Sequence, residues 1–245
     1  MTRSSQTVYH SQVMQNRPAR PTWRHVAIDG PVASGKSTVA RLLAIDLGAT
    51  FLDTGALYRA VAYLALCARA DPNDDATVLR LLAAHPPAVK AGPQPLQYSI
   101  AVDGQTLDRQ LFTPSVSRAV SAVAAMPEVR HRLIGVQRAF AAERDVVMAG
   151  RDIGSVVLPN ADFKFFLTAS LDARVQRRLR ELVQQGIDID AAALREEIKG
   201  RDDRDAGRAL SPLVKAPEAL EIDTSAMSVG EVVQTLSAIV RKNSE

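Results

Sequence analysis

The sequence is poor in cysteine, in aromatic residues and in long apolar runs, and each shortage excludes a class of protein. One cysteine among 245 residues excludes a disulfide framework and any metal site built from several cysteines. No stretch approaches the roughly 18 consecutive apolar residues that a membrane-spanning helix requires. Aromatic residues are only 4%, so we expect an aliphatic core. Cys67 closes the apolar run 62–67, which predicts a small buried residue rather than a reactive thiol.

The net charge of +3 comes from one end of the chain. Residues 1–24 hold four arginines and no acidic residue, so residues 25–245 carry 3 − 4 = −1. This body lacks the basic bias of a nucleic-acid-binding protein, and we expect no nucleic-acid partner. The 30 basic residues comprise 24 Arg and 6 Lys. Arginine pairs well with phosphate, so this bias fits phosphate binding, although genome composition explains it equally well.

Residues 1–24 are predicted to be a disordered tail. They are polar and show no sustained apolar period, and they lack the apolar centre of a secretory signal. Arginine and serine without acid are weakly typical of an organelle transit peptide, but a disordered extension is the simpler interpretation. We therefore expect a cytoplasmic protein, with no membrane partner, that folds over residues 25–245.

Short apolar runs alternate with amphipathic segments along the body. The predicted strands are 25–29, 51–53, 145–149, 163–167 and 219–222. The predicted helices are 37–47, 55–70, 74–84, two that begin at Thr113-Pro114 and after Met126-Pro127, 171–185, 190–208 and 228–242. Such alternation predicts an α/β fold with a parallel sheet covered on both faces. Within residues 88–110, two short runs flank Asp103-Gly104, which predicts a small antiparallel insertion.

The segment Gly30–Ser37 (GPVASGKS) matches the phosphate-binding P-loop at every fixed position. A predicted strand precedes it and a predicted amphipathic helix follows, as the motif requires. Glycine lets the backbone curl so that its N–H groups converge on phosphate oxygens, and the helix N-terminus faces the same anion. Lys36 would reach the β- and γ-phosphates, and the Ser37 hydroxyl would coordinate Mg²⁺. The predicted nucleotide-binding residues are Gly30, Pro31, Val32, Ala33, Ser34, Gly35, Lys36, Ser37 and Thr38.

A P-loop alone is compatible with a motor, a switch or a kinase. A GTPase would need a guanine-binding N-K-x-D motif, and the sequence has none. A helicase would need a second core and an acidic strand end, whereas the strand 145–149 ends in Ala149. A small kinase is therefore favoured.

Four further motifs follow the P-loop: 52–59 (LDTGALYR), 150–154 (GRDIG), 201–205 (RDDRD) and 222–225 (IDTS). Together with the P-loop they resemble the bacterial cytidylate kinases, which transfer a phosphoryl group from ATP to CMP or dCMP. The resemblance extends from about His25 to the C-terminus. Adenylate and guanylate kinases share the P-loop but not this set.

The resemblance implies where the acceptor nucleotide binds. It places Thr54, Tyr58 and Arg59 in the acceptor site, with Arg59 on the CMP phosphate. It places Arg151 and Arg208 on phosphates from the opposite side.

Three residues, Ser121, Arg130 and Asp152, fall where the family binds cytosine. Arg201 and Asp205 fall where it holds the ribose.

The resemblance also implies a mobile lid at about 190–208. Arg204 would approach the transferred group, so Lys36, Arg151, Arg204 and Arg208 are the predicted catalytic residues. Arg201, Arg204 and Arg208 recur at i, i+3 and i+7, which predicts that one helical face carries all three.

The expected fold is a three-layer P-loop kinase with a five-stranded parallel sheet, a CMP-binding insertion at about 88–110 and this lid. The expected enzyme is a monomeric, Mg²⁺-dependent (d)CMP kinase. Phosphoryl transfer needs positioning and cationic stabilisation more than a general base, which agrees with the lack of a hydrolase-type triad. Ala149 departs from the family, which usually has an acid there that can anchor Mg²⁺-bound water. A kinase for UMP or a non-nucleotide acceptor, and a non-catalytic nucleotide-binding regulator, are the alternatives.

Overall fold

The computed structural model describes residues 23–91, 98–184, 186–208 and 210–243. Its centre is a five-stranded sheet in the order β2-β6-β1-β7-β8, and every neighbouring pair in it is parallel. The strands are β1 (His25–Asp29), β2 (Thr50–Asp53), β6 (Val146–Ala149), β7 (Phe163–Thr168) and β8 (Leu220–Asp223). The predicted parallel sheet is confirmed, and each predicted strand lies within two residues of an observed one.

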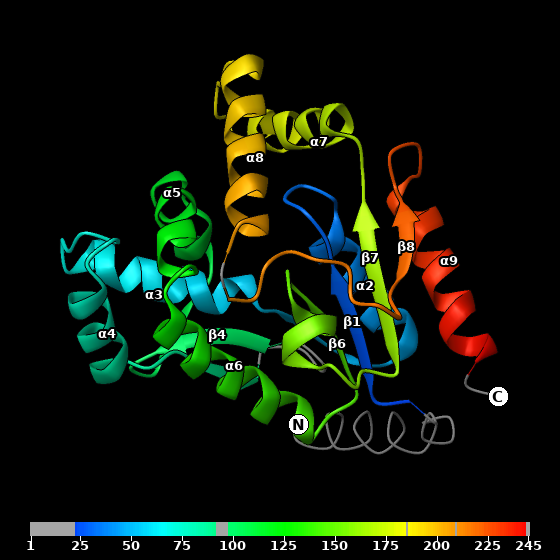
Figure 1. The fold of residues 1–245 in the computed structure, drawn as a ribbon, viewed down its shortest axis with the longest axis horizontal. Helices are drawn as coiled ribbons and strands as arrows, with labels where there is room; N and C mark the ends of the chain where they lie inside the picture. Colours follow the sequence, from blue (N-terminus) through cyan, green and yellow to red (C-terminus); the bar gives the residue numbers. More distant parts are fainter. Residues whose placement is uncertain (1–22, 92–97, 185, 209, 244–245) are drawn as a thin grey trace, which may run out of the picture.

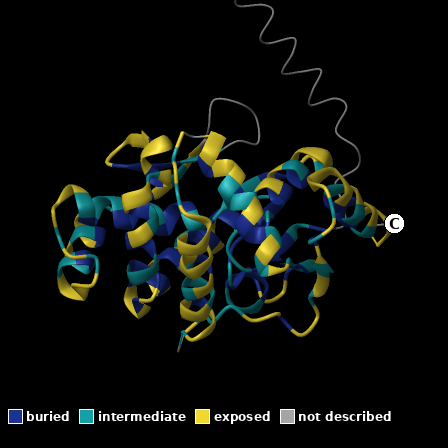
Figure 2. Ribbon diagram, turned by 90° about the horizontal axis from the view of Figure 1, so that it is seen from above, coloured by how far each residue is buried: buried dark blue, intermediate teal, exposed yellow. Residues whose placement is uncertain are grey.

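Helices cover both faces of the sheet (Figure 1). One face packs against α2 (Lys36–Leu47) and α9 (Val229–Lys242) through an apolar cluster. The other face packs on a larger cluster built from α3 (Gly55–Cys67), α4 (Asp75–Ala84), α5 (Pro114–Val123) and α6 (Pro127–Ala142). The exposed outer sides and buried inner sides of these helices are visible in Figure 2.

Local sequence signals determine several helix boundaries. The residue after α2, Gly48, has φ +67°, the left-handed conformation that glycine adopts without strain. Before α5, the Thr113 side chain accepts a hydrogen bond from the Val116 N–H, and Pro114 occupies the first helical position. Both signals were sufficient to predict the boundary from sequence.

The antiparallel insertion is also confirmed. A three-stranded sheet consists of β3 (Ala88–Ala91), β4 (Tyr98–Val102) and β5 (Gln105–Leu107), and Asp103-Gly104 forms the turn between the last two. Positive φ angles at both turn residues, +50° and +83°, fit this tight connection. Short helical turns η1 (Arg109–Phe112) and η2 (Ile153–Val157) complete the fold.

Two helices, α7 (Leu171–Gln184) and α8 (Ala191–Ala206), stand beyond the carboxyl ends of the sheet strands (Figure 1). They pack on each other through a small apolar cluster that includes Val175, Leu182, Leu194 and Ile198. This cluster is separate from the two clusters that cover the sheet.

Two expectations about individual residues are wrong. Cys67 is exposed, because it is the last residue of α3 and lies beyond the face that packs on the core. The folded chain begins before residue 25: Trp23 is 4% exposed within the cluster of α2 and α9, and the Arg24 N–H donates to Asp162 at 2.9 Å. The other residues of the predicted tail, 1–22, lie outside the described residues.

Removal of residues 1–22 should leave the melting temperature and kcat/KM unchanged within error, because their composition is not that of a packed element. Trp23→Ala should instead destabilise the protein by about 3–5 kcal/mol, since it removes a buried aromatic side chain. Thermal and urea unfolding of both variants would check this. A large destabilisation by the deletion would show that residues 1–22 pack on the fold.

Among the residues that the structure describes, no helix is both long and apolar enough to cross a membrane.

Candidate functional site

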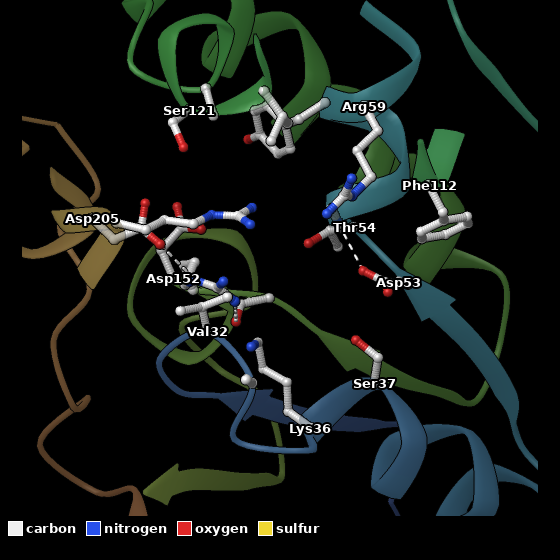
Figure 3. A pocket seen from close by; sticks show the side chains of 18 of the residues that line it. Val32, Lys36, Ser37, Asp53, Thr54, Arg59, Phe112, Ser121, Asp152 and Asp205 are labelled. Atoms are coloured by element: carbon white, nitrogen blue, oxygen red, sulfur yellow. Dashed lines mark hydrogen bonds and ion pairs between the residues drawn. The ribbon is translucent and has the colours of Figure 1, made fainter. Parts of the chain in front are cut away.

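A cavity of about 310 Å³ lies at the carboxyl ends of the parallel strands, where open α/β sheets commonly bind ligands. The residues that form its walls come from the P-loop and α2, from α3 and α5, and from α7 and α8. Figure 3 shows the cavity from close by. Its lining residues are Val32, Ala33, Gly35, Lys36, Ser37, Thr38, Asp53, Thr54, Gly55, Tyr58, Arg59, Phe112, Val120, Ser121, Ala124, Arg130, Gly150, Arg151, Asp152, Arg178, Glu181, Arg201, Asp205 and Arg208.

The P-loop follows β1 directly and forms one wall of the cavity. At Gly30, with φ +153°, an added Cβ would lie 2.2 Å from the Leu167 carbonyl oxygen, so only glycine fits against β7. Gly35 has φ +86°, and Ala33 adopts φ +58°, which is strained for a residue with a side chain. The chain therefore maintains a curled loop at an energetic cost, as a phosphate-binding loop requires.

Lys36 points into the cavity from this wall (Figure 3). It is 7% exposed, and its ammonium group donates to the Pro31 carbonyl at 2.9 Å. Burial lowers the pKa of Lys36 well below its usual value, and the nearby Arg151 cation lowers it further. An anion in the cavity would relieve both effects.

Several arginines converge on the centre of the cavity. Arg59 is fixed by bonds to the Leu111 carbonyl at 3.2 Å and the Ser117 hydroxyl at 2.9 Å, and its guanidinium lies 5.3 Å from the centre of the Phe112 ring. Arg151 donates to Asp205 at 2.8 Å.

Arg208 also forms an ion pair with Asp205. The Arg201 side chain makes no hydrogen bond or ion pair with the described residues; burial lowers its pKa to about 10, and repulsion from Arg151 adds to this. These cations outnumber the acids that face them, so the cavity favours a highly charged anion.

The wall opposite the P-loop is formed by α5, α6 and the loop after β6. Arg130 and Asp152 form an ion pair there and are 3% and 4% exposed. Arg130 also donates to the Ala124 carbonyl at 3.2 Å, and its guanidinium lies 5.3 Å from the centre of the Tyr58 ring. Ser121 points into the cavity from above Asp152 (Figure 3). The P-loop wall thus faces a polar recess that carries one buried acidic residue, Asp152, and one buried basic residue, Arg130.

A model of the cytidylate kinase family matches residues 26–242. Two cytidylate kinases of Streptococcus pneumoniae, from strains 70585 and Hungary19A-6, are each 42% identical to this chain over 218 residues, which is 89% of this chain and 97% of the relative. The chain belongs to the cytidylate kinase family. Among solved structures, shikimate kinase from Acinetobacter baumannii is 15% identical with a TM-score of 0.45, covering 91% of this chain and 96% of that one.

The cavity of this cytidylate kinase brings together all but four of the predicted site residues. Three of the four, Gly30, Pro31 and Ser34, belong to the P-loop but do not line the cavity. Ser34 is buried, and its hydroxyl has no hydrogen-bond partner among the described residues.

The fourth residue outside the cavity is Arg204, which is exposed on α8. The prediction that one helical face carries Arg201, Arg204 and Arg208 is wrong, because α8 ends at Ala206. The chain then turns and brings Arg208 back onto Asp205.

Eight of the lining residues of the kinase are not among the predicted site residues: Asp53, Gly55, Phe112, Val120, Ala124, Gly150, Arg178 and Glu181. Arg178 and Glu181 lie on α7 and form an ion pair at 2.9 Å, and Phe112 lies at the end of η1. The cluster Arg174, Arg177 and Arg178 was the available signal for α7. Phe112, which is 54% exposed, has no signal in the sequence.

Asp53, the last residue of β2, places a carboxylate at the wall of the cavity. It lines the cavity beside Ser37, and one carboxylate oxygen accepts the Gly55 N–H at 3.0 Å (Figure 3). Its neighbour in the sheet is Ala149, whose side chain is 1% exposed in the core beneath α2 and does not line the cavity. A hydroxyl and a carboxylate are hard oxygen donors, and they fit a Mg²⁺ ion that keeps most of its water and phosphate ligands.

Asp29, the last residue of β1, joins the P-loop strand to the loop after β6. Its carboxylate accepts the N–H groups of Ile153 at 2.8 Å and Gly154 at 2.7 Å. Burial raises its pKa to about 6, although these two hydrogen bonds oppose the shift.

This raised pKa predicts a specific pH dependence of stability. The folded state binds the Asp29 proton more tightly than the unfolded state does. The contribution of this bound proton to the free energy of unfolding is therefore fully present below about pH 4 and is lost as the pH rises through about 6. The stability of wild type relative to Asp29→Asn should therefore fall by about 2 kcal/mol between pH 4 and pH 6. Urea unfolding of both proteins from pH 4 to 7 measures this difference, and a constant difference would show that Asp29 ionises normally.

Proposed function

We propose that this cavity is where the two substrates of the kinase react. The enzyme transfers the γ-phosphoryl group of ATP to CMP or dCMP, which gives ADP and CDP or dCDP. The observation that supports this site is that a single cavity has a P-loop on one wall and the buried Arg130–Asp152 pair on the opposite wall. Arginines lie between the two, where phosphates from both substrates would meet.

The donor side consists of the P-loop, residues 30–38. Its N–H groups and Lys36 would bind the phosphates of ATP. The Ser37 hydroxyl and the Asp53 carboxylate would hold Mg²⁺, which when bound neutralises charge on the donor phosphates. Ala149 contributes no oxygen here, so in this chain the protein ligands would come from the P-loop and from β2.

The acceptor side is assembled from α3, α5, α6 and the lid. Arg59, held in place by its hydrogen bonds and by Phe112, would bind the CMP phosphate together with Arg151 and Arg208. Thr54 and Tyr58 would form the floor of this site.

The cytosine ring would contact Ser121, Arg130 and Asp152, and the ribose would contact Arg201 and Asp205. The Asp152 Oδ1 atom accepts no hydrogen bond from the described residues, so it is available to the base.

Catalysis would then depend on position and charge. The acceptor phosphate is already anionic near neutral pH, so the transfer requires no strong general base. Lys36, Arg151 and Arg208 would stabilise the charge that develops on the transferred group and on the leaving oxygen. Arg204, exposed on α8, would join them only after movement of the lid.

A coupled ADP-release assay with CMP, dCMP, UMP and AMP tests this function. We expect phosphorylation of CMP and dCMP with far weaker reaction of UMP and AMP. Preference for UMP would favour a different acceptor kinase. ATP binding without transfer to any of the four would favour a nucleotide-binding regulator.

Three further assignments belong to this proposal. The chain from Trp23 onward forms the catalytic domain, in which 88–110 supports acceptor binding and 190–208 is the lid. The described part of the insertion does not line the cavity, so its support would be indirect. The enzyme is cytoplasmic and works as a monomer. The monomer is supported by the complete cavity that one chain supplies. Sedimentation at several protein concentrations would test this oligomeric state.

Arg208→Ala should lower kcat more than it raises the KM for CMP. Arg208 lies beyond the end of α8 and is tied to Asp205, so lid closure would press it onto the phosphates mainly in the transition state. Steady-state kinetics with varied CMP separate the two parameters. If only KM rises, Arg208 binds the ground state and has no catalytic role.

A further inference from the structure

Helix α8 contacts the P-loop at Val32. The Asp202 carboxylate accepts the Val32 N–H at 3.2 Å, and its second oxygen is ion-paired with Arg174 of α7. Arg174 also donates to the Val32 carbonyl at 3.2 Å. One ion pair between the two lid-side helices therefore holds both backbone polar groups of a P-loop residue.

This ion pair is largely shielded from water and well satisfied. Arg174 is 8% exposed, and its Nε donates to the Ala169 carbonyl at 3.1 Å, which fixes the plane of the guanidinium. The Val32 side chain packs on the apolar cluster between α7 and α8. A buried, hydrogen-bonded pair of this kind is sensitive to the loss of either partner, because the remaining charge is left uncompensated.

The contact with Val32 determines the direction of the next peptide group. In a trans peptide the carbonyl of one residue and the N–H of the next point to opposite sides. With the Val32 carbonyl turned toward Arg174, the Ala33 N–H is turned away from α7, and Ala33 lines the cavity. Ala33 is also the strained residue with φ +58°, so its conformation depends on contacts that hold its neighbours.

A second arginine of α7 makes an equivalent contact. Arg177 donates to the Ser34 carbonyl at 3.3 Å and to the Thr224 hydroxyl at 3.0 Å. By the same peptide geometry, the Gly35 N–H is turned away from Arg177. Helix α7 thus holds two P-loop carbonyls, those of Val32 and Ser34, on the side of the loop that faces α7.

We propose that Arg174 and Asp202 are positioning residues that orient the P-loop N–H groups toward the donor phosphates and couple this loop to α8. The inference rests on the proposed function of the cavity. Because Arg201 and Asp205 of α8 line the same cavity, the pair links the donor loop to the element that carries acceptor-side residues. Neither positioning residue touches the reacting atoms.

The test measures nucleotide binding separately from turnover. Asp202→Asn and Arg174→Ala should each weaken the binding of ADP, measured by calorimetry, by at least about tenfold, because each removes a charge-assisted hydrogen bond that orients the loop. CMP binding should weaken by a smaller factor than ADP binding, because the proposed CMP contacts lie outside the P-loop. Amide exchange in residues 30–37 should become faster in both variants, which a loss of catalysis alone would not produce.

The control is a second ion pair between the same helices. Asp172 of α7 and Arg195 of α8 are paired at the protein surface and do not line the cavity. Arg195→Ala should leave ADP affinity, loop exchange and kcat within about twofold of wild type. In the Arg174→Ala/Asp202→Asn double variant, the loss of ADP affinity should exceed the loss in the weaker-binding single variant by no more than about twofold. The reason is that the two residues act as one unit.

Unchanged ADP affinity in Asp202→Asn and Arg174→Ala would overturn the proposal. An equal loss in Arg195→Ala would also overturn it, since general packing of α7 on α8 would then explain the effect. Failure of the proposed function would give a different result from failure of this inference. If the proposed function is wrong, the wild-type protein forms no CDP. The ADP affinities of the variants can still be compared in that case, because ADP binding does not depend on the acceptor.

Discussion

Lys36→Ala should lower kcat by at least about 10²–10³. Lys36 is the cationic side chain of the P-loop, and the loss of one preorganised donor at a developing charge typically has an effect of this size. The measurement is kcat at saturating ATP and CMP. Near-normal turnover would contradict the assignment of the ATP site.

The structure separates this effect from any effect on folding. The Lys36 ammonium is buried beside Arg151, and its lowered pKa means that the charged form is held in the folded protein at a cost. Lys36→Ala should therefore unfold at the same urea concentration as wild type or at a higher one near pH 7. Lys215, an exposed lysine paired with Glu221 away from the cavity, is the matched control, and Lys215→Ala should keep both kcat and stability.

Features encoded by a few neighbouring residues were predictable from the sequence. The P-loop, the Gly48 helix end and the Thr113-Pro114 helix start each depend on local backbone conformation, which short motifs specify directly. The parallel sheet was predictable because the alternation of short apolar runs with amphipathic segments leaves few other arrangements.

Features that depend on the course of the chain in three dimensions were not predictable. The helical spacing of Arg201, Arg204 and Arg208 suggested a common face, but α8 ends at Ala206 and only two of the three reach the cavity. The Arg130–Asp152 pair joins residues 22 positions apart, and the resemblance indicated both residues without indicating that they bind each other. Arg178 lacked any motif that distinguishes it from its neighbours on α7.

The second large expected effect is on base selection, which we assign to the Arg130–Asp152 pair. Cytosine presents an N4 amino donor and an N3 acceptor, whereas uracil presents an O4 acceptor and an N3–H donor. Asp152 would accept from the N4 amino group through its available oxygen, and Arg130 would donate to N3 and O2. UMP in the same pose would create two mismatched contacts, so kcat/KM for CMP should exceed that for UMP by about 10²–10⁴.

Asp152→Asn should lower kcat/KM for CMP and also narrow the CMP/UMP ratio. An amide can rotate to present either a donor or an acceptor, so it tolerates uracil better than a carboxylate does. The substitution also leaves Arg130 without its buried partner, which typically destabilises a protein by about 3–5 kcal/mol. The CMP/UMP ratio of kcat/KM is insensitive to this loss of stability, because a smaller folded fraction lowers the rates with both nucleotides equally.

Asp205→Asn is the matched control for this experiment. Asp205 is also a buried, ion-paired aspartate of the cavity, but it faces Arg151 and Arg208 rather than the base recess. Its substitution should lower kcat/KM for CMP and UMP in the same proportion and leave their ratio unchanged. If Asp152→Asn leaves the ratio unchanged as well, Asp152 does not contact the base. The cytosine preference would then have to arise from Ser121 or from the shape of the recess.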